Sequence, residues 1–369
     1  MTSKNSIPSH QYWYFLVVLI AITSCKNGFN FEPSTEAITV EKMVDASLLY
    51  PDENGDSSCE SLMATKKGFM CVGYYYDSQN NEYINAITTW DNEGNALNIN
   101  EFSSPKSSSS YVLSSVDKYI NTSDGSIVAL GLASNMYTAF KFNSDGELLW
   151  EKEILSFTDY KRYSISLFEG DDNYFLLASD DELQTKHSTF EISKDGSEIN
   201  EEVTESEFRR FTVRKISNDK AIFVGANTNS LSGVVKIADI NGKTIKEKDY
   251  PTLPLSFGVF LDKSRSYLLI DNRGRGYKTD KNLNIEWDTS LSGFNFTSSE
   301  IIETEAGNFL YNTQDEIYLY SIEGDLLDEY LIPPESHSFR NPIKLTNGNI
   351  VISAYAGASS QLIFFNTSE

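Results

Sequence analysis

One short pattern recurs along most of the chain and limits the folds that it can adopt. A polar or glycine-containing turn is followed by three or four consecutive apolar residues and then by a small or polar residue. Successive copies end 41 to 58 residues apart. Self-similarity at such a period is typical of repeat proteins, in which each copy is one supersecondary unit. The seven copies end at Gly73, Gly131, Ala178, Gly225, Asp271, Asn312 and Ser353.

A second pattern follows each of the first six apolar runs and indicates a hairpin. Its six turns share one register, with Asp, Asn or Ser three places before a position that is glycine in five of them. The small polar side chain can hydrogen-bond the turn backbone, and glycine accepts a positive φ. Each repeat thus holds about four strands, and no segment keeps a 3.6-residue period, so the fold class is all-β. The glycine positions are Gly94, Gly146, Gly196, Gly242, Leu283 and Gly324.

The two ends of the repeat region indicate a closed ring. The seventh repeat stops after its third strand, which would leave an open strand edge. Residues 38–44 resemble the fourth strands at 148–154 and 244–250. We therefore predict that residues 38–369 form a seven-bladed β-propeller of four-stranded antiparallel blades, closed by the N-terminal strand. Six or eight blades would require one repeat to be misassigned.

The turns also carry a resemblance to a known family. In quinoprotein-like propellers, which share a PQQ-like or WD40-like fold, a D-x-x-G-x-x-x-W pattern places Trp on the last strand of a blade. Asn143, Gly146 and Trp150 match it with Asn in first place, and Asp280 with Trp287 match it without the glycine. In architecture only, a membrane-anchored propeller also resembles the BamB family of scaffold lipoproteins. The other repeats carry Asn98, Asn200, Lys246 and Asp328 at the Trp position.

The N-terminus resembles the signal of a bacterial lipoprotein. Lys4 precedes an eleven-residue apolar run at 12–22, which is too short to span a bilayer core about 30 Å thick. Residues 22–25, Ile-Thr-Ser-Cys, resemble the lipobox, whose cysteine is lipidated and becomes the new N-terminus. We expect residues 1–24 to be a signal peptide, Cys25 to carry acyl chains such as palmitate, and residues 25–37 to form a polar tether. An ordinary secretory signal, with Cys25 incidental, is the alternative.

This N-terminal signal predicts a lipid-anchored protein of the bacterial cell envelope, located at the outer membrane. The signal does not distinguish the periplasmic from the surface side of that membrane. The 30 Lys and Arg against 53 Asp and Glu give a net charge of −23. Such a surface repels phosphate backbones and anionic headgroups, so we expect no nucleic-acid partner and no polybasic membrane docking. We expect a monomer that contacts the membrane through its lipid.

The remaining cysteines and histidines indicate no metal site. No CxxC motif or Cys/His cluster occurs, and the repeats contain no sequence signal of a calcium-binding loop. They also show no sign of a quinone-binding pocket, so we expect neither metal nor cofactor. A hairpin about Lys67 and Gly68 would set Cys71 near Met63 rather than opposite Cys59. This register favours two separately buried thiols, although a disulfide in an oxidising compartment stays open. His187 and His337 fall in predicted loops of different blades.

These residues favour binding over catalysis. No HExxH, GxSxG or P-loop spacing is present, so we predict a non-enzymatic binding or scaffold module for a protein or glycan. Loops at one face of the propeller would supply the contacts. A polysaccharide hydrolase or lyase that uses the propeller channel is the alternative, and a passive envelope protein is a third possibility.

Two kinds of side chain are candidates for ligand contact. In the run Tyr74-Tyr75-Tyr76, rings alternate between the two faces of a strand, so rings outside the core, such as that of Tyr76, could stack on a ligand. Arginines concentrate in blades 4 and 5, and either point to the channel mouth or offset the acidic surface. We take Arg273, Arg275 and Tyr76 as candidate binding residues. The arginine set is Arg209, Arg210, Arg214, Arg273 and Arg275.

Overall fold

The chain divides into two units, Met1–Glu36 and Ala37–Glu369, and all the described residues belong to the second. The predictions of a signal peptide over 1–24, a tether over 25–37 and a lipid on Cys25 lie outside the described residues. The computed structural model describes residues 38–46, 57–80, 82–102, 116–133, 136–156, 165–179, 186–205, 208–217, 219–227, 232–239, 243–294, 300–313, 316–331, 342–356 and 359–367.

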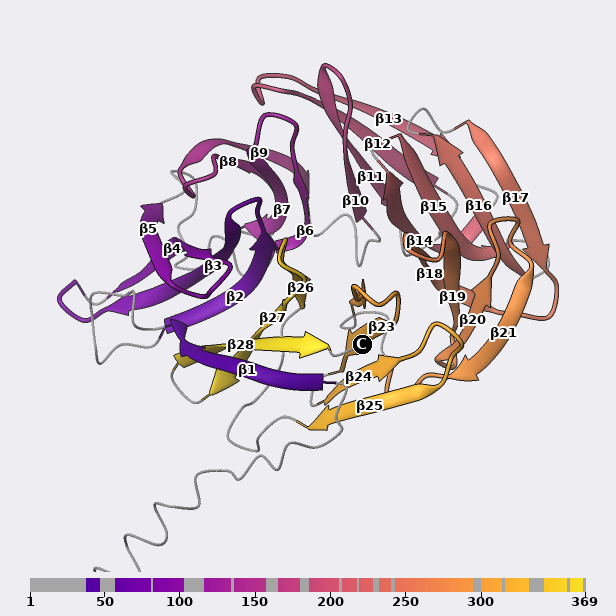
Figure 1. Ribbon diagram of the computed structural model, residues 1–369. Helices are drawn as coiled ribbons and strands as arrows, with labels where there is room; N and C mark the ends of the chain where they lie inside the picture. Colours follow the sequence, from indigo (N-terminus) through magenta and orange to yellow (C-terminus); the bar gives the residue numbers. More distant parts are fainter. Residues whose placement is uncertain are drawn as a thin grey trace, which may run out of the picture. The chain divides into compact units, whose positions relative to one another are not determined.

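The described residues form seven four-stranded antiparallel sheets, arranged in a ring (Figure 1). This confirms the prediction of an all-β, seven-bladed propeller. Blade 1 contains β2 (Ser57–Ala64), β3 (Gly68–Asp77), β4 (Glu82–Asp91) and β5 (Ala96–Phe102). Blade 2 contains β6 (Val116–Asn121), β7 (Ile127–Ala133), β8 (Met136–Phe142) and β9 (Leu148–Ser156). Blade 3 contains β10 (Ile165–Glu169), β11 (Asn173–Ser179), β12 (Lys186–Ser193) and β13 (Ile199–Glu205).

The remaining blades keep the same order from inner to outer strand. Blade 4 contains β14 (Phe208–Ser217), β15 (Lys220–Asn227), β16 (Gly233–Asp239) and β17 (Thr244–Tyr250). Blade 5 contains β18 (Leu255–Leu261), β19 (Ser266–Asp271), β20 (Arg275–Thr279) and β21 (Ile285–Ser290). Blade 6 contains β22 (Ile301–Glu303), β23 (Phe309–Asn312), β24 (Glu316–Tyr320) and β25 (Leu326–Leu331). Blade 7 contains β26 (Ile343–Lys344), β27 (Ile350–Ala356), β28 (Ser359–Thr367) and β1 (Ile38–Asp45).

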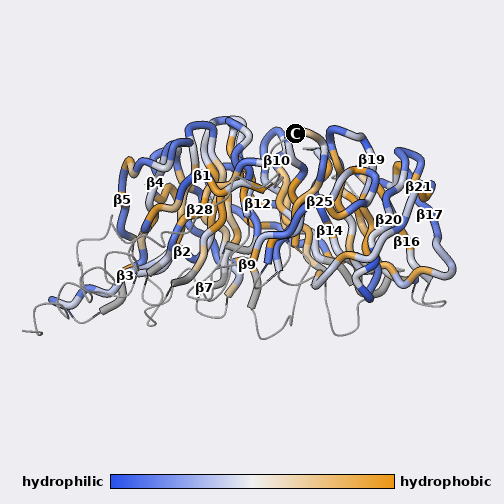
Figure 2. The backbone as a smooth tube through the Cα atoms, turned by 60° about the horizontal axis from the view of Figure 1, so that its bottom comes forward, coloured by the Kyte–Doolittle hydropathy of each residue, from blue (hydrophilic) through white to orange (hydrophobic). Residues whose placement is uncertain are grey.

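The apolar runs of the sequence are the second strands of the blades, and they explain where the core lies. All side chains of β19 and β23 are buried, whereas the outer strands β21 and β25 alternate between exposed and half-buried. A second strand is covered on both faces by the neighbouring blades, so apolar residues are favoured on both. Figure 2 shows the apolar segments inside the blades and hydrophilic segments along outer strands such as β17. The core is therefore divided among the seams between blades.

The N-terminal strand closes the ring, as predicted. β1 pairs antiparallel with β28 from Ile38 opposite Thr367 to Asp45 opposite Gln361. The Nζ atom of Lys42 in β1 donates a hydrogen bond to the carbonyl oxygen of Glu93, at 2.8 Å, in a turn of blade 1. Strand β1 thus completes blade 7 and also ties it to blade 1.

Among the described residues, no helix offers a stretch long and apolar enough to cross a bilayer.

The described hairpin turns between third and fourth strands also follow the prediction, whereas the predicted turn glycine Gly242 lies outside the described residues. Asp91 shows how they are held: its carboxylate accepts hydrogen bonds from the backbone N–H of Glu93 and of Asn95. Burial alone would raise the pKa of Asp91, but the bonds from Asn95 and Glu93 outweigh it and lower that pKa below its ordinary value. Four of the turn glycines have positive φ values between 72° and 93°, and Leu283 has a φ of 65°. These glycines are Gly94, Gly146, Gly196 and Gly324.

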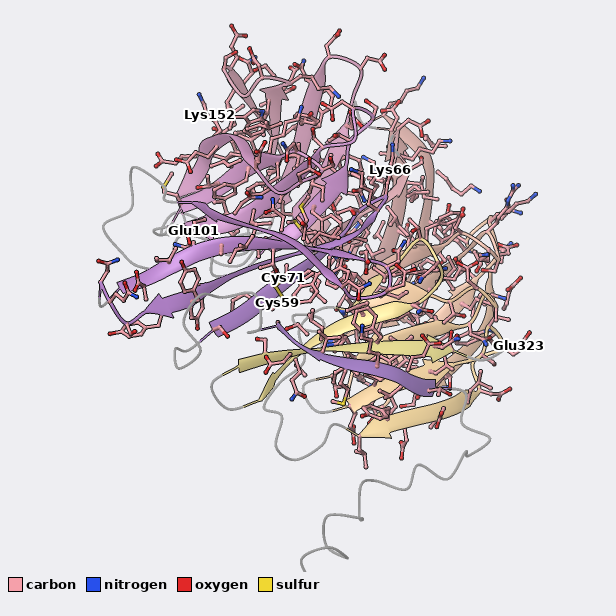
Figure 3. All side chains as sticks on the ribbon, turned by 60° about the vertical axis from the view of Figure 1, so that its left-hand side comes forward. Cys59, Lys66, Cys71, Glu101, Lys152 and Glu323 are labelled. Atoms are coloured by element: carbon pink, nitrogen blue, oxygen red, sulfur yellow. A yellow bond between two sulfur atoms is a disulfide. The ribbon has the colours of Figure 1, made fainter. Side chains whose placement is uncertain are left out.

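Cys59 and Cys71 form a disulfide, so the expectation of two separate thiols is wrong (Figure 3). Cys71 lies opposite Leu62, one place from the predicted partner, and Cys59 lies opposite Gly73. A bulge in β2 between Cys59 and Ser61 leaves the two cysteines as diagonal neighbours with Cα atoms 5.6 Å apart. That separation is within the range that a disulfide bridges.

The disulfide lies at the seam where the ring closes. The backbone N–H of Cys59 donates to the Ser360 hydroxyl of blade 7, at 2.9 Å. The hydroxyl of Ser353, also in blade 7, donates to the Cys59 carbonyl, at 2.8 Å. The covalent bond therefore holds the inner hairpin of blade 1 at the residue that binds blade 7.

Candidate functional site

Tryptophan packs at two seams where the repeat keeps Trp on the last strand of a blade. The indole N–H of Trp150 in blade 2 donates to the Lys194 carbonyl of blade 3, at 3.2 Å. The ring covers the turn glycine so closely that a Cβ on Gly196 would lie 2.7 Å from it. Trp287 in blade 5 repeats this arrangement on blade 6, with a 2.8 Å bond to the Ile322 carbonyl. The pattern therefore joins the outer strand of one blade to the turn of the next.

The seam between blades 4 and 5 is built differently. Lys246 stands at the Trp position, and its Nζ atom donates to the Lys281 carbonyl. Leu283 stands at the glycine position, where its side chain is fully buried with Tyr250, Tyr267 and other seam residues. A left-handed conformation costs a non-glycine residue about 1 kcal/mol, and burial of the leucine side chain offsets that cost. The Tyr250 hydroxyl donates to the Leu283 carbonyl across the seam.

Beside this buried cluster the seam opens into a groove of about 620 Å³, which we call the seam groove. One wall is the end of β17 and the loop that leaves it, and the other consists of the β19–β20 turn with β20 and β21. Arg275 pairs with Ser290, and Tyr277 pairs with Asp288, so these side chains share the sheet face that lines the groove. The lining residues are Asp249, Tyr250, Pro251, Thr252, Leu253, Pro254, Asp271, Arg273, Arg275, Tyr277, Ile285, Asp288 and Ser290.

Hydrogen bonds hold both walls of the seam groove in place. The Asp271 carboxylate accepts from the backbone N–H of Arg273 at 2.8 Å, from that of Arg275 at 3.0 Å, and from the Tyr277 hydroxyl at 3.1 Å. Burial and the bond to Asp271 raise the pKa of Tyr277 to about 12, so this hydroxyl stays a donor near neutral pH. The Asn272 N–H donates to the Pro254 carbonyl, at 3.1 Å, and joins the two walls. The groove is therefore preformed.

The charges of the seam groove are unequally compensated. Arg275 forms an ion pair with Asp288. The buried Asp271 carboxylate is satisfied by the three donors given above. Within the described part of the chain, the exposed side chains of Arg273 and Asp249 have no ion-pair partner. The groove thus offers an available guanidinium on one wall and an available carboxylate on the other.

The groove offers apolar surface but no exposed aromatic ring face. Tyr250 and Tyr277 are only 5% and 7% exposed, and both hydroxyls are engaged in hydrogen bonds. Pro251 is exposed, Leu253 is half-buried, and Ile285 on the other wall is 43% exposed. Sugars are commonly held against aromatic faces, which these rings do not present. The groove is therefore better suited to aliphatic side chains.

The structure brings two of the three sequence-predicted binding residues together. Arg273 and Arg275 line one groove, whereas Tyr76 lies half-buried at the end of β3 in blade 1, which does not adjoin blade 4 or 5. The binding roles of all three stay predictions. His187 belongs to β12, and its side chain, like those of Arg209 and Arg210, lies outside the described residues, as does His337.

A second charged group, which the sequence reasoning missed except for Arg214, lies inside the ring. The Glu300 carboxylate contacts Lys118 Nζ at 3.4 Å and the Arg214 guanidinium at 3.3 Å. These residues come from blades 2, 4 and 6, which are not neighbours, so they can meet only inside the ring. We call them the central cluster.

The central cluster keeps its acid ionised. Burial alone would raise the pKa of Glu300, but Arg214 and Lys118 outweigh it and hold that pKa below its ordinary value. A carboxyl group of this kind is a poor general acid near neutral pH, which weighs against glycoside cleavage by Glu300. In the described ranges, no three His, Cys, Asp or Glu side chains gather as metal ligands.

One signal in the sequence could have located the seam groove. Lys246 and Leu283 are the positions where blades 4 and 5 depart from the Trp and glycine of the pattern. Both departures fall on one seam, and this seam opens into the seam groove. Asn98, Asn200 and Asp328 also replace the Trp, but only here is the facing turn glycine replaced as well, and this double departure marks the candidate site more directly than the arginine count does.

Comparison with solved structures identifies propellers. The chain is similar to the Dos1 propeller, with a TM-score of 0.51 and 10% identity over 90% of this chain and 96% of that one. It is also similar to the C-terminal WD40 domain of Sif2, with a TM-score of 0.53 and 11% identity over 89% and 100% of the two chains. No protein-family model matches the sequence, and the comparison with curated proteins found no match.

At these identities the similarity shows the fold alone, a WD40-like seven-bladed β-propeller. That fold is consistent with a protein-binding scaffold module.

Proposed function

We propose that the chain is a membrane-tethered scaffold lipoprotein of the bacterial envelope, which binds a partner protein in the seam groove. One observation carries the binding part of this proposal: a preformed groove combines the available Arg273 guanidinium with aliphatic walls. Protein contact sites pair buried apolar anchors with a few placed polar groups. A protein is favoured over a glycan because both tyrosine rings of the groove are buried.

The Cys59–Cys71 disulfide supports an address outside the cytoplasm. Disulfides persist in oxidising compartments such as the bacterial periplasm and are rare in the cytosol. The apolar run at 12–22 and the lipobox-like residues before Cys25 support the same address. The architectural resemblance to the BamB family fits a scaffold held at a membrane by lipid.

Protein binding is tested by photo-cross-linking in the native envelope. A photoreactive amino acid replaces Thr252, which is exposed on the groove wall, in the full chain. We expect one discrete protein adduct, identified by mass spectrometry, that disappears when Ile285→Trp fills the groove. The matched control places the same probe at Lys66, an exposed turn residue of blade 1. An adduct that survives Ile285→Trp, or that forms equally from Lys66, would overturn the proposed site.

Anchoring is tested separately with Cys25→Ala. Cells fed an alkyne fatty acid should label the unaltered chain and leave the variant unlabelled. The variant should also move from the membrane fraction to the fraction released without detergent, because acyl chains hold the protein to the bilayer. Equal labelling or an unchanged distribution would contradict a lipid on Cys25.

A further inference from the structure

We infer that the seam groove recognises an extended segment of its partner in which a single carboxylate side chain adjoins an aliphatic one. The inference rests on the proposed binding function and names the chemistry of the ligand. The carboxylate would pair with Arg273, and the aliphatic side chain would pack against Leu253, Pro251 and Ile285.

The two arginines of the groove differ in their ion pairing. Arg275 is neutralised by Asp288, whereas Arg273 has no ion-pair partner among the residues that the structure describes. The backbone of Arg273 is fixed by its bond to the buried Asp271 carboxylate, so the guanidinium is presented from a rigid turn. A guanidinium binds a carboxylate through two parallel N–H bonds, which favours an Asp or Glu side chain over a neutral amide.

The overall charge limits how acidic the segment is. The chain carries a net charge of −23, which repels a strongly acidic partner at long range. Asp249 on the opposite wall is exposed and would repel a second carboxylate inside the groove. The preferred segment therefore carries one acid next to Arg273 and a neutral or basic residue near Asp249.

The outer strand of blade 5 favours an extended ligand. β21 is the last strand of its sheet, so among the described residues its outer edge has no strand partner. Ile285 and Ser290, at its two ends, both line the groove. Five steps along a strand cover about 17 Å, which matches about five residues of an extended segment. The backbone of such a segment could also bond the free edge.

The inference is tested by selecting ligands from a random peptide library displayed on phage, with the purified full chain as bait. We expect the selected peptides to share one Asp or Glu within two residues of an aliphatic side chain. Fluorescence anisotropy should show at least tenfold weaker binding of a selected peptide to Arg273→Gln and Arg273→Glu. A peptide whose acid is changed to Lys should recover binding to Arg273→Glu, because the charges are then exchanged.

The matched control is Arg265→Glu, which makes the same charge change at an exposed position in the β18–β19 turn of the same blade. Its binding should equal that of the unaltered chain. Peptides selected without an acid, or unchanged affinity in Arg273→Glu, would overturn the inference. If Ile285→Trp still abolishes binding in that case, the groove remains the binding site and only the ligand chemistry is wrong. If binding survives Ile285→Trp, both the seam groove as the binding site and the proposed ligand chemistry are wrong.

Discussion

Blades 5 and 6 meet over Trp287, whereas blades 4 and 5 meet over Tyr250 and Leu283. In the first seam the indole covers Gly324 and bonds the Ile322 carbonyl, so the outer strand seals against the next turn. In the second seam the ammonium group of Lys246, in place of an indole, bonds the Lys281 carbonyl of the next turn. The seam opens into a groove beside the buried Leu283. In these two seams the repeat thus gives a sealed contact where Trp287 faces Gly324 and an open one where Lys246 faces Leu283.

The positions that stabilise the ring differ from the positions that are available for binding. The ring of Trp287 packs against Phe309 of the next blade, so this surface is taken up by the seam itself. The seam between blades 4 and 5 is held by Leu283 at its centre and by hydrogen bonds at the rim of the groove. Stability and a binding surface are thus divided between neighbouring seams of one ring.

The largest predicted effect is at the sealed seam. Trp287→Ala should lower the free energy of unfolding by about 3 to 4 kcal/mol, because it removes a large half-buried ring that stacks on Phe309 across the seam. Lys246→Ala, at the equivalent position of the open seam, should cost less than about 1 kcal/mol, since its interactions are partly exposed. Urea unfolding of both variants checks the contrast. Equal losses would mean that the two seams are not packed differently.

The closure seam between blades 7 and 1 should show the next largest effect. The double variant Cys59→Ser, Cys71→Ser should lose about 3 kcal/mol, because the disulfide restricts the unfolded chain. A reducing agent should lower the melting temperature of the unaltered chain to that of the variant and leave the variant unchanged. A melting temperature that does not respond to reduction would contradict a formed disulfide.

Leu283 tests whether the open seam has its own stabilising centre. Leu283→Gly removes a buried side chain, at a cost of about 3 kcal/mol, and relieves about 1 kcal/mol of left-handed strain, for a net loss of about 2 kcal/mol. Leu283→Ala keeps the strain and should be less stable than Leu283→Gly. Thermal unfolding of the pair checks this order. If Leu283→Gly is more stable than the unaltered chain, Leu283 does not replace the missing Trp.

The central cluster should give the smallest effect, visible mainly as a pH dependence. The pKa of Glu300 in the folded chain lies below the ordinary value of 4.5, so the unfolded chain takes up its proton first as the pH falls. The contribution of Glu300 to stability is complete above about pH 5 and is lost as the pH drops through the folded pKa. Glu300→Gln should therefore flatten the fall of melting temperature between pH 5 and pH 3. An unchanged slope would exclude the pairs with Lys118 and Arg214.

Much of the fold could be predicted because its determinants are local. The turn register from Asp91 to Gly94 needs only four residues, and the closing strand was recognisable because residues 38–44 resemble other outer strands. The disulfide was missed because a bulge in β2 has no clear sequence signal, and it moves Cys59 within reach of Cys71. Turn motifs and strand patterns can be recognised in the sequence, whereas a one-residue bulge cannot.

The candidate site was predicted only in part, for a different reason. Arg273 and Arg275 were chosen because arginines concentrate in blades 4 and 5, and the structure places both on the seam groove. Tyr76 was chosen as an aromatic ring outside the core of its strand, and it lies in blade 1, which does not adjoin blade 4 or 5. Lys118 and Glu300 could not be paired from sequence, since only ring closure brings their blades together.

Amide hydrogen exchange on the full chain, with and without a peptide selected from the library, tests most directly whether the open seam is the binding site. Bound peptide should slow exchange at residues 249–254, 271–277 and 285–290, and leave the blade 6 side of the sealed seam, around Ile322 and Gly324, unchanged. Protection centred instead on the central cluster, at Lys118, Arg214 and Glu300, or on Tyr76 in blade 1, would contradict the account.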